Sequence, residues 1–324
     1  MPQATLLQAI HDTLHEEMAR DPRVLVMGED VGREGGVFRV TEGLIDRFGP
    51  DRVIDTPLNE GGIVGMAIGM ALNGLRPVVE IEFADFIYPA FDQIVSELAK
   101  LRYRSAGLFT APVVVRAPSG GGIKGGAYHS QSPEAYFIHT AGLTVAMPST
   151  PADAKGLLAS AVRGPDPVLL FEPKALYRTV KGEVPEGEHL VPFGKGRIVR
   201  PGEDLTLVAW GAMVPVASMA ADLAAAEGVR IEVIDPRTLW PLDIALIEES
   251  VNRTGRAVVL HEAPRTCGFG AEVSALIQER CFLRLKAPVG RVTGYDTPFP
   301  YALEKSYLPD PEKTACAVRA AMEF

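Results

Sequence analysis

Cysteine is scarce in this sequence, and no apolar run is long. The 324 residues include three cysteines, Cys267, Cys281 and Cys316, without Cys-x-x-Cys spacing or a nearby histidine pair. This set excludes a disulfide framework and a Cys/His zinc site, and it predicts a reduced, cytoplasmic setting. The longest charge-free apolar stretch, 61–75, contains five glycines and falls short of the ~20 residues that a membrane-spanning helix needs. We therefore expect no membrane partner.

Several function classes lack their motifs here. The sequence has no His-Glu-x-x-His, no Gly-x-Ser-x-Gly and no Walker motif, so neither a hydrolase nor a nucleoside triphosphatase is indicated. Lys and Arg number 32 against 41 Asp and Glu, a net charge of −9, which repels a phosphate backbone and argues against nucleic acid as a partner. With 47% hydrophobic and 23% charged residues, the chain is globular and long enough for about two domains.

Apolar, β-branched runs alternate with segments of helical spacing along the first part of the chain. This pattern predicts strands at 23–27, 77–83, 112–116, 143–147 and 167–171, and helices at 61–75, 91–104 and 151–162. The last helix has a clear beginning, because Ser149 or Thr150 can cap it and Pro151 suits the first turn. The alternation predicts an α/β fold with a parallel sheet covered on both faces.

A polar segment rich in Gly, Pro and Glu, 181–196, interrupts this alternation and has the composition of a linker. We place a first domain at 1–180 and a second, smaller α/β domain at 197–324. In the second domain, strands are predicted at 205–210, 230–234 and 257–261, and helices at 214–226, 244–251 and 271–281. The first twenty residues carry apolar side chains at helical spacing and an acidic polar face, which predicts a native helix rather than a transit peptide.

The most unusual segment is SGGGIKGGAYHSQSPE, 119–134, where glycines lead to a single histidine, His129. Gly120, Gly122 and Gly125 satisfy Gly-x-Gly-x-x-Gly, but no helix follows at once to meet a pyrophosphate, which argues against dinucleotide binding. The glycines instead allow the backbone to bend tightly beside a ligand or a neighbouring chain. His129 follows a strand end, where α/β folds place ligand sites, although a structural loop histidine fits the same context.

A second candidate is Glu60, which follows Asp55-Thr56-Pro57-Leu58-Asn59 at the start of a glycine-rich helix. The carboxylate is either a helix-end acid that the macrodipole favours or a group whose pKa is raised by desolvation for proton transfer. The residues 83–91 form a dense aromatic cluster that is either core or the wall of a flat ligand's site.

Seven segments together resemble the beta subunits of the 2-oxo acid dehydrogenase complexes, most closely the branched-chain members. They follow the family's order from end to end: DTPLNEGGIVGMAIGMA (55–71), FADFIYPAFDQI (83–94), LRYRS (101–105), YHSQSPEA (128–135), FEPKALYR (171–178), HEAP (261–264) and GYDTPFP (294–300). The resemblance implies a transketolase-like pyrimidine-binding domain and a smaller transketolase C-terminal domain. It also implies a thiamine diphosphate-dependent decarboxylating enzyme assembled as an alpha2/beta2 heterotetramer.

The resemblance assigns roles to particular residues. Glu60 matches the glutamate that shares a proton with the aminopyrimidine ring and so helps to deprotonate the thiazolium carbon. His129 matches the histidine that assists acyl transfer to the lipoyl group. Leu58 falls among the cofactor-binding positions, and Phe86 replaces a cofactor-contacting tyrosine, so stacking is kept while the hydroxyl is lost. A potassium ion on backbone carbonyls would align with Pro112, Val114, Val115, Ala161, Gly164 and Asp166.

The remaining implications concern partners and substrate. Thiamine enzymes hold the diphosphate through Mg²⁺ on a Gly-Asp-Gly motif, which this chain lacks, so the alpha subunit is expected to supply it. The C-terminal domain is expected to dock the lipoyl-bearing acyltransferase core. The histidine segment and Asp296-Thr297-Pro298-Phe299-Pro300 follow the branched-chain pattern, which predicts 3-methyl-2-oxobutanoate dehydrogenase (2-methylpropanoyl-transferring) activity. A pyruvate dehydrogenase (acetyl-transferring) beta subunit is the alternative.

Overall fold

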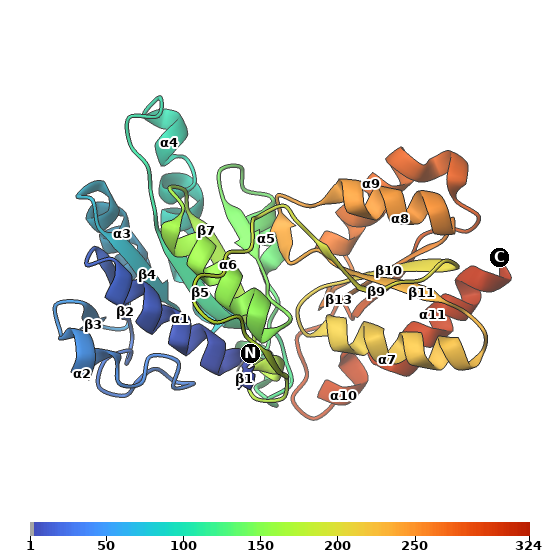
Figure 1. Cartoon of the computed structure of the whole chain (residues 1–324), viewed down its shortest axis with the longest axis horizontal. Helices are drawn as coiled ribbons and strands as arrows, with labels where there is room; N and C mark the ends of the chain where they lie inside the picture. The colour runs from blue at the N-terminus through green and yellow to red at the C-terminus, as the bar shows by residue number, and fades with distance from the viewer. Residues whose placement is uncertain (1–2) are drawn as a thin grey trace.

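The computed structural model describes residues 3–324 and consists of two α/β halves that lie side by side (Figure 1). A seven-stranded sheet forms the first half, with the strand order β12-β6-β7-β5-β4-β2-β3. Six of these strands are parallel, and β12 pairs antiparallel with β6. The strands are β2 (Val24–Gly28), β3 (Val53–Asp55), β4 (Arg76–Glu80), β5 (Val114–Ser119), β6 (Thr144–Ala146), β7 (Val168–Pro173) and β12 (Thr238–Trp240).

Alternate residues of each central strand face two different hydrophobic cores. Val24, Val26 and Val78 pack beneath α1 (Leu6–Arg20) and α6 (Pro151–Arg163). Leu25, Met27 and Val79 pack on the opposite side, beneath α3 (Glu60–Leu72) and α5 (Glu134–Ile138). The expected parallel sheet with both faces covered is therefore confirmed. Thr150 is the residue that caps α6, and its side chain accepts the Asp153 N–H at 3.1 Å.

A five-stranded sheet with the order β14-β13-β10-β11-β9 forms the second half. Helices α7 and α11 cover one face, and α8 and α9 cover the other (Figure 1). The strands are β9 (Arg197–Arg200), β10 (Leu205–Ala209), β11 (Ile231–Asp235), β13 (Ala257–Pro264) and β14 (Gly290–Gly294), and the helices are α7 (Met213–Ala226), α8 (Ile244–Thr254), α9 (Phe269–Cys281) and α11 (Pro311–Glu323). The short helices α2 (Leu44–Phe48), α4 (Leu101–Arg104) and α10 (Glu304–Tyr307) lie outside these layers.

One predicted helix is not continuous in the structure. The segment 91–104 was expected to be a single helix, but it contains a π-helix, Gln93–Leu98, and a turn before α4 begins at Leu101. The Ala99 N–H donates to the Ile94 carbonyl at 3.0 Å, five residues back, which is the wider spacing of a π turn. The Ala99 carbonyl is meanwhile approached so closely by Gly142 that a Cβ there would lie 2.0 Å away. Tertiary packing thus interrupts a segment whose local pattern favours one helix.

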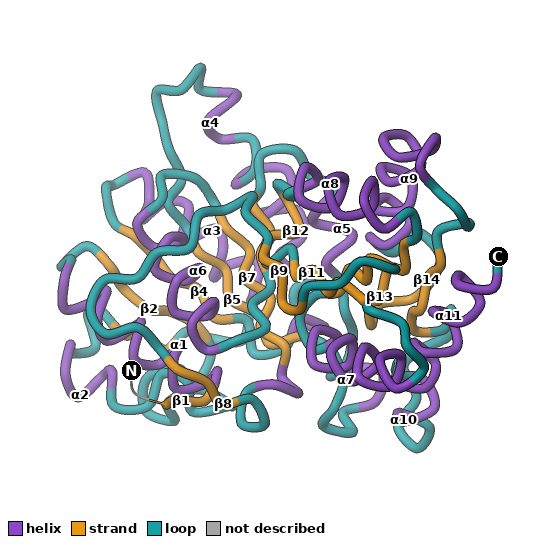
Figure 2. The backbone as a smooth tube through the Cα atoms, turned by 45° about the vertical axis from the view of Figure 1, so that its right-hand side comes forward, coloured by secondary structure: helices purple, strands orange, loops and turns teal. Residues whose placement is uncertain are grey.

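The segment 181–196 is packed on the first half of the chain (Figure 2). Its first residues form β8 (Lys181–Glu183), which pairs antiparallel with β1 (Gln3–Thr5). Val184 and Val191 are buried, and a Cβ on Gly156 of α6 would lie 2.4 Å from Val191. Because β12 also crosses from the second half into the first sheet, the two proposed domains, 1–180 and 197–324, are joined by more than one segment. Within residues 3–324, no helix is long and apolar enough to cross a membrane.

Candidate active site

Glu60 is the first residue of α3, and its side chain is buried, with 7% of its surface exposed. The helix begins here because the Asn59 side chain accepts the Gly62 N–H at 2.9 Å. Glu60 is therefore an acid at a helix N-terminus, and its side chain is buried.

Two further glutamates, Glu29 and Glu82, join Glu60 at the carboxyl ends of parallel strands. Glu29 directly follows β2, and Glu82 follows the neighbouring β4 by two residues. Desolvation, followed by the charge of Glu60, raises the pKa of Glu29 to about 7. The Oε1 atom of Glu29 is buried and has no hydrogen-bond partner among the described residues. Burial likewise raises the pKa of Glu82, with Asp30, Glu80 and Glu60 acting in the same direction.

Sequence reasoning did not single out Glu29 or Glu82. The sequence did contain a signal for them, because each lies at or near the carboxyl end of a predicted strand. The carboxyl ends of neighbouring parallel strands meet at one edge of the sheet, so acidic residues there are brought together. Of the three carboxyl groups, that of Glu29 can hold a proton near neutral pH, and the group as a whole offers acceptors to a ligand that donates hydrogen bonds.

His129 lies against this acidic site and is half-buried. It ends a short 3₁₀ turn, Gly126–Tyr128, in the loop that follows β5. Its ring stands edge-on to Phe83, with centroids 4.7 Å apart, and to Phe86, with centroids 5.3 Å apart. The imidazole also acts on Glu82, whose pKa it lowers against the larger effect of burial. The structure thus brings Glu60, His129 and Phe86 to the same edge of the first sheet.

Leu58, in contrast to Glu60, is exposed to solvent. It has 79% of its surface exposed, although it is only two residues before the buried Glu60. Tyr128, beside His129, is also mostly exposed. Phe83 and Phe86 therefore form one wall of the candidate site, whereas the Leu58 side chain is not buried in it.

A buried ion network supports the strands beneath the site. Arg116 of β5 is fully buried and donates to Glu80 of β4 at 2.6 Å and to Glu172 of β7 at 2.7 Å. The Tyr177 hydroxyl donates to the other oxygen of Glu172 at 2.5 Å. These contacts join three neighbouring strands close to Glu82 and to the start of the loop that carries His129, and losing one partner of such a buried network costs about 3–5 kcal/mol.

The residues proposed for a potassium ion lie on or just before β5 and around the end of α6: Pro112, Val114, Val115, Ala161, Gly164 and Asp166. One of their carbonyl groups already has a cationic partner, because Arg76 Nη1 donates to the Gly164 oxygen at 2.9 Å. Asp166 is paired with Arg102 at 2.5 Å. The Arg76 guanidinium opposes a second cation at the same oxygen. Among residues 3–324, no group of three or more His, Cys, Asp or Glu side chains is arranged to hold a metal ion.

Two family models match the chain, one to each half. The transketolase pyrimidine-binding domain matches residues 3–180, and the transketolase C-terminal domain matches residues 194–314. Among solved structures, a split-gene transketolase described as an inactive beta4 tetramer has a TM-score of 0.81 over 98% of both chains. Its sequence identity is 24%, so this likeness shows the fold.

Curated relatives match nearly the whole chain at about half identity. The 2-oxoisovalerate dehydrogenase subunit beta of Pseudomonas aeruginosa is 51% identical over 98% of this chain and 95% of its own length. A mitochondrial protein of the same name from Dictyostelium discoideum is 52% identical over 98% of this chain and 86% of its own length. The pyruvate dehydrogenase E1 component subunit beta of Leifsonia xyli is also 52% identical, over 98% and 95%.

Proposed function

The chain belongs to the family of 2-oxo acid dehydrogenase beta subunits, and from this membership we propose that it is the beta subunit of a branched-chain 2-oxo acid dehydrogenase. In this role it takes part in the oxidative decarboxylation of branched-chain 2-oxo acids and in transfer of the acyl group to a lipoyl-bearing acyltransferase. The observation that carries the proposal is the convergence of Glu60, Phe86 and His129 at one edge of the pyrimidine-binding half.

The residues at this edge fit the aminopyrimidine part of thiamine diphosphate. Glu60 offers a buried carboxylate, and Glu29 offers a buried oxygen without a partner among the described residues, so both suit the nitrogen-bound hydrogens of such a ring. Phe86 offers an aromatic face or edge beside it. When bound, thiamine diphosphate supplies a carbon nucleophile and an electron sink for decarboxylation.

Glu60 serves in this proposal as the proton-sharing group of the site. Its carboxylate holds a ring-nitrogen proton, and the surrounding carboxyl groups of Glu29 and Glu82 disfavour additional negative charge there. His129 serves as the group that donates or accepts a proton where the lipoyl group enters. Packing against Phe83 and Phe86 fixes the orientation of its ring.

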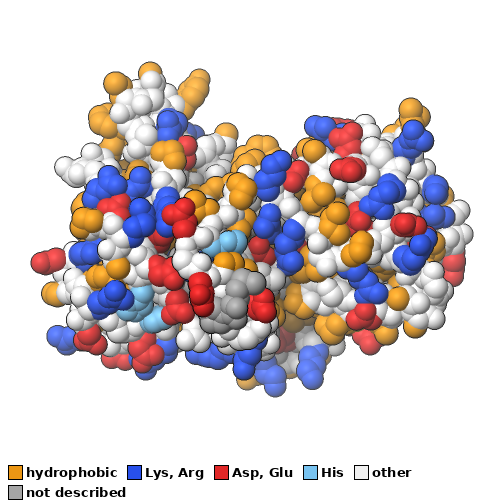
Figure 3. All heavy atoms as spheres, viewed as in Figure 1, with side chains coloured by type: hydrophobic (Ala, Val, Ile, Leu, Met, Phe, Trp, Pro, Cys, Tyr) orange, Lys and Arg blue, Asp and Glu red, His pale blue; other side chains and the backbone are white. Residues whose placement is uncertain are grey.

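A partner chain is required to complete this site. The chain has no Gly-Asp-Gly segment, so we propose that an alpha subunit binds the diphosphate and Mg²⁺ within an alpha2/beta2 heterotetramer. Figure 3 shows hydrophobic side chains gathered on the projection that carries α4, where Tyr103 is 91% and Leu108 is 83% exposed. An apolar projection of this kind is typical of a surface that another chain covers.

The branched-chain preference rests on sequence motifs and on the names of several relatives. Identity alone does not separate the two substrate classes, because relatives of both classes match at 51–52%. Pyruvate is therefore the competing substrate. One methylene in an apolar pocket changes binding by only about 1–3 kcal/mol, so the preference must be measured on the assembled enzyme.

A reconstitution experiment tests the split site. The purified chain alone should not decarboxylate a 2-oxo acid with thiamine diphosphate and Mg²⁺, whereas mixing it with its cognate alpha chain should restore turnover. Activity of the chain alone would contradict the proposal.

We further propose that a potassium ion binds the remaining carbonyls of the set at β5 and the end of α6, away from the Gly164 oxygen that Arg76 occupies. The thermal unfolding midpoint should then be higher in potassium chloride than in an equal concentration of choline chloride, and equal midpoints would remove that site from the proposal.

A further inference from the structure

The loop that carries His129, residues 119–131, is held by carboxylate side chains on both of its limbs. We call this segment the histidine loop. On its first limb, the Gly121 N–H donates to Glu262 Oε1, and the Lys124 N–H donates to Glu304 Oε2 at 3.0 Å. On its second limb, the N–H groups of Ser130 and Gln131 both donate to Asp85 Oδ1, at 3.2 and 3.0 Å.

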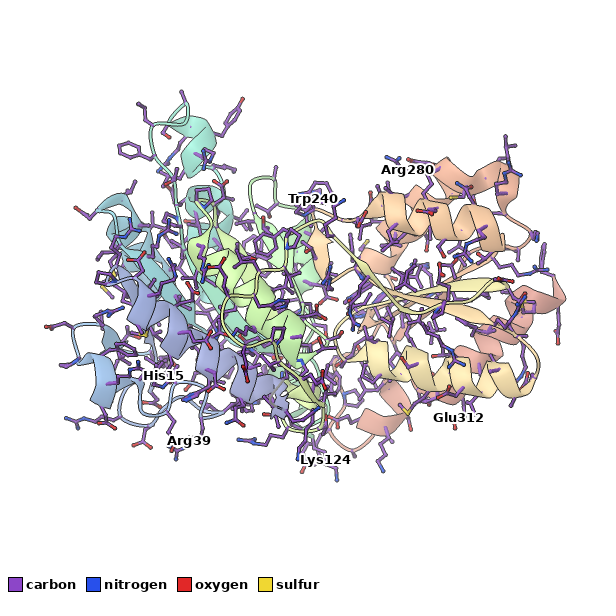
Figure 4. All side chains as sticks on the ribbon, in the orientation of Figure 1. His15, Arg39, Lys124, Trp240, Arg280 and Glu312 are labelled. Carbon is purple, nitrogen blue, oxygen red and sulfur yellow. The ribbon has the colours of Figure 1, made fainter. Side chains whose placement is uncertain are left out.

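These carboxylates come from opposite halves of the molecule. Asp85 follows β4 in the first half, whereas Glu262 belongs to β13 and Glu304 begins α10, both in the second half. Figure 4 shows Lys124 at the lower edge of the junction between the two halves. The Lys174 ammonium is buried nearby and lowers the pKa values of Asp85 and Glu262, against the larger effect of burial. A single buried cation therefore favours the charged form of a carboxylate on each side of the loop.

The glycines of the loop allow the second half to approach this closely. A Cβ on Gly121 would lie 2.5 Å from Phe299 Cζ, and a Cβ on Gly120 would lie 2.9 Å from Glu262 Oε1. Gly120 also has a φ of +78°, in the region where side chains are unfavourable. The sequence predicted a tight bend beside a ligand or a neighbouring chain, but the close neighbours of Gly120 and Gly121 are Glu262 and Phe299 of the same chain.

We propose that Glu262 and Glu304 are positioning residues, through which the C-terminal half fixes the histidine loop and hence His129. Asp85 anchors the other limb from the first half. Glu262 and Glu304 contact loop backbone rather than the imidazole, so they act on the reaction only through the loop. The role of these two glutamates rests on the proposed function, because the part that His129 plays in acyl transfer belongs to that function.

Hydrogen–deuterium exchange tests directly whether Glu262 and Glu304 restrain the histidine loop. It is measured on the full chain bound to its alpha subunit. Glu262→Ala and Glu304→Ala remove the acceptors of Gly121 and Lys124, so the loop peptide should exchange at least about tenfold faster, the change expected when a hydrogen bond to a charged group is lost. Glu262→Gln keeps a carbonyl acceptor and should restore part of the protection. Glu279→Ala, an exposed acid on α9, should leave the loop unchanged.

A kinetic cycle then links the loop to His129. Acyl transfer to lipoyl domains should fall in Glu304→Ala, but this substitution should have little further effect in a His129→Ala background, because both changes act through one group. Additive losses, or unchanged exchange in both alanine variants, would overturn the inference and leave the proposed function standing. Faster loop exchange in the Glu262→Ala and Glu304→Ala variants would support the restraint of the loop. Normal acyl transfer in His129→Ala would, separately, contradict the proposed role of His129.

Discussion

The imidazole of His129 is perpendicular to the ring of Phe83, with an interplanar angle of 90° and centroids 4.7 Å apart. Phe83 lies just beyond the end of β4, whereas His129 belongs to the loop that follows β5. Aromatic pairs favour this edge-to-face arrangement. The contact therefore ties the glycine-rich loop to the edge of the sheet, and it places His129 beside the carboxyl groups that surround Glu60.

The first prediction concerns Glu60→Gln in the assembled enzyme. The amide keeps the shape of the side chain but cannot share the proton, and such acid–base contributions are typically worth about 10²- to 10⁴-fold. Decarboxylation should fall by that order while the thermal unfolding midpoint stays close to that of the parent. Glu312→Gln, on the exposed surface, is the matched control. Near-normal turnover would reduce Glu60 to a helix-end acid.

His129→Ala should separate the two half-reactions. If the imidazole acts where the lipoyl group enters, acyl transfer to lipoyl domains should fall much further than decarboxylation measured with an artificial electron acceptor. Parallel assays on one enzyme preparation give this comparison. Equal losses in the two assays would argue against that assignment.

Gly121→Ala should disturb the histidine loop by direct collision with Phe299, since the new Cβ would lie 2.5 Å from the ring. Acyl transfer should drop, and Phe299→Leu in the same chain should recover part of it by removing the colliding atom. Gly69→Ala is the matched control, because nothing lies within 4 Å of its Cβ position in α3, and alanine favours a helix. If Phe299→Leu does not restore acyl transfer in the Gly121→Ala chain, the collision with Phe299 is not the cause of the loss.

His261 makes stability depend on pH. Burial, reinforced by Arg291, lowers its pKa from 6.5 to about 3, and its ring stacks on Trp210 at 5.2 Å. Because the folded protein keeps His261 neutral, its contribution to the free energy of unfolding is fully present above pH 6.5. This contribution is lost as the pH falls toward 3, since the unfolded chain binds the proton at a higher pH than the folded chain does. Between pH 7 and 5 this amounts to about 2 kcal/mol of unfolding free energy.

Urea unfolding of the parent and of His261→Leu at both pH values measures that difference. Leucine does not titrate, so the variant should lose about 2 kcal/mol less than the parent on acidification. An identical pH dependence in both proteins would show that His261 does not titrate differently in the folded state.

The sequence predicts the layers of this fold well, because buried parallel strands are continuous apolar runs and their helices carry caps such as Thr150. It does not predict β12, whose three residues complete the first sheet from the second half, because such pairing depends on long-range packing. The same limit applies to the break in 91–104, where the approach of Gly142 to Ala99 prevails over local helical preference.

For the site, the motifs around Glu60 and His129 were sufficient to predict candidates, since both residues have distinctive neighbours in the chain. Glu262 and Glu304 were not predicted. Their contacts with Gly121 and Lys124 bridge 141 and 180 residues of sequence, and no local pattern marks a carboxylate that accepts a hydrogen bond from a distant backbone. Glu262 is part of a recognised motif, yet the motif alone does not reveal which group it holds.

The most direct test of the account is the ratio of kcat/KM for 3-methyl-2-oxobutanoate and pyruvate, measured with this chain assembled with its native alpha subunit, thiamine diphosphate and Mg²⁺. The account predicts that turnover requires both chains and that kcat/KM is at least about tenfold higher for 3-methyl-2-oxobutanoate, the lower end of what an apolar pocket can discriminate. A clear preference for pyruvate would contradict the branched-chain assignment in favour of a pyruvate dehydrogenase, and turnover without the alpha chain would contradict the shared active site.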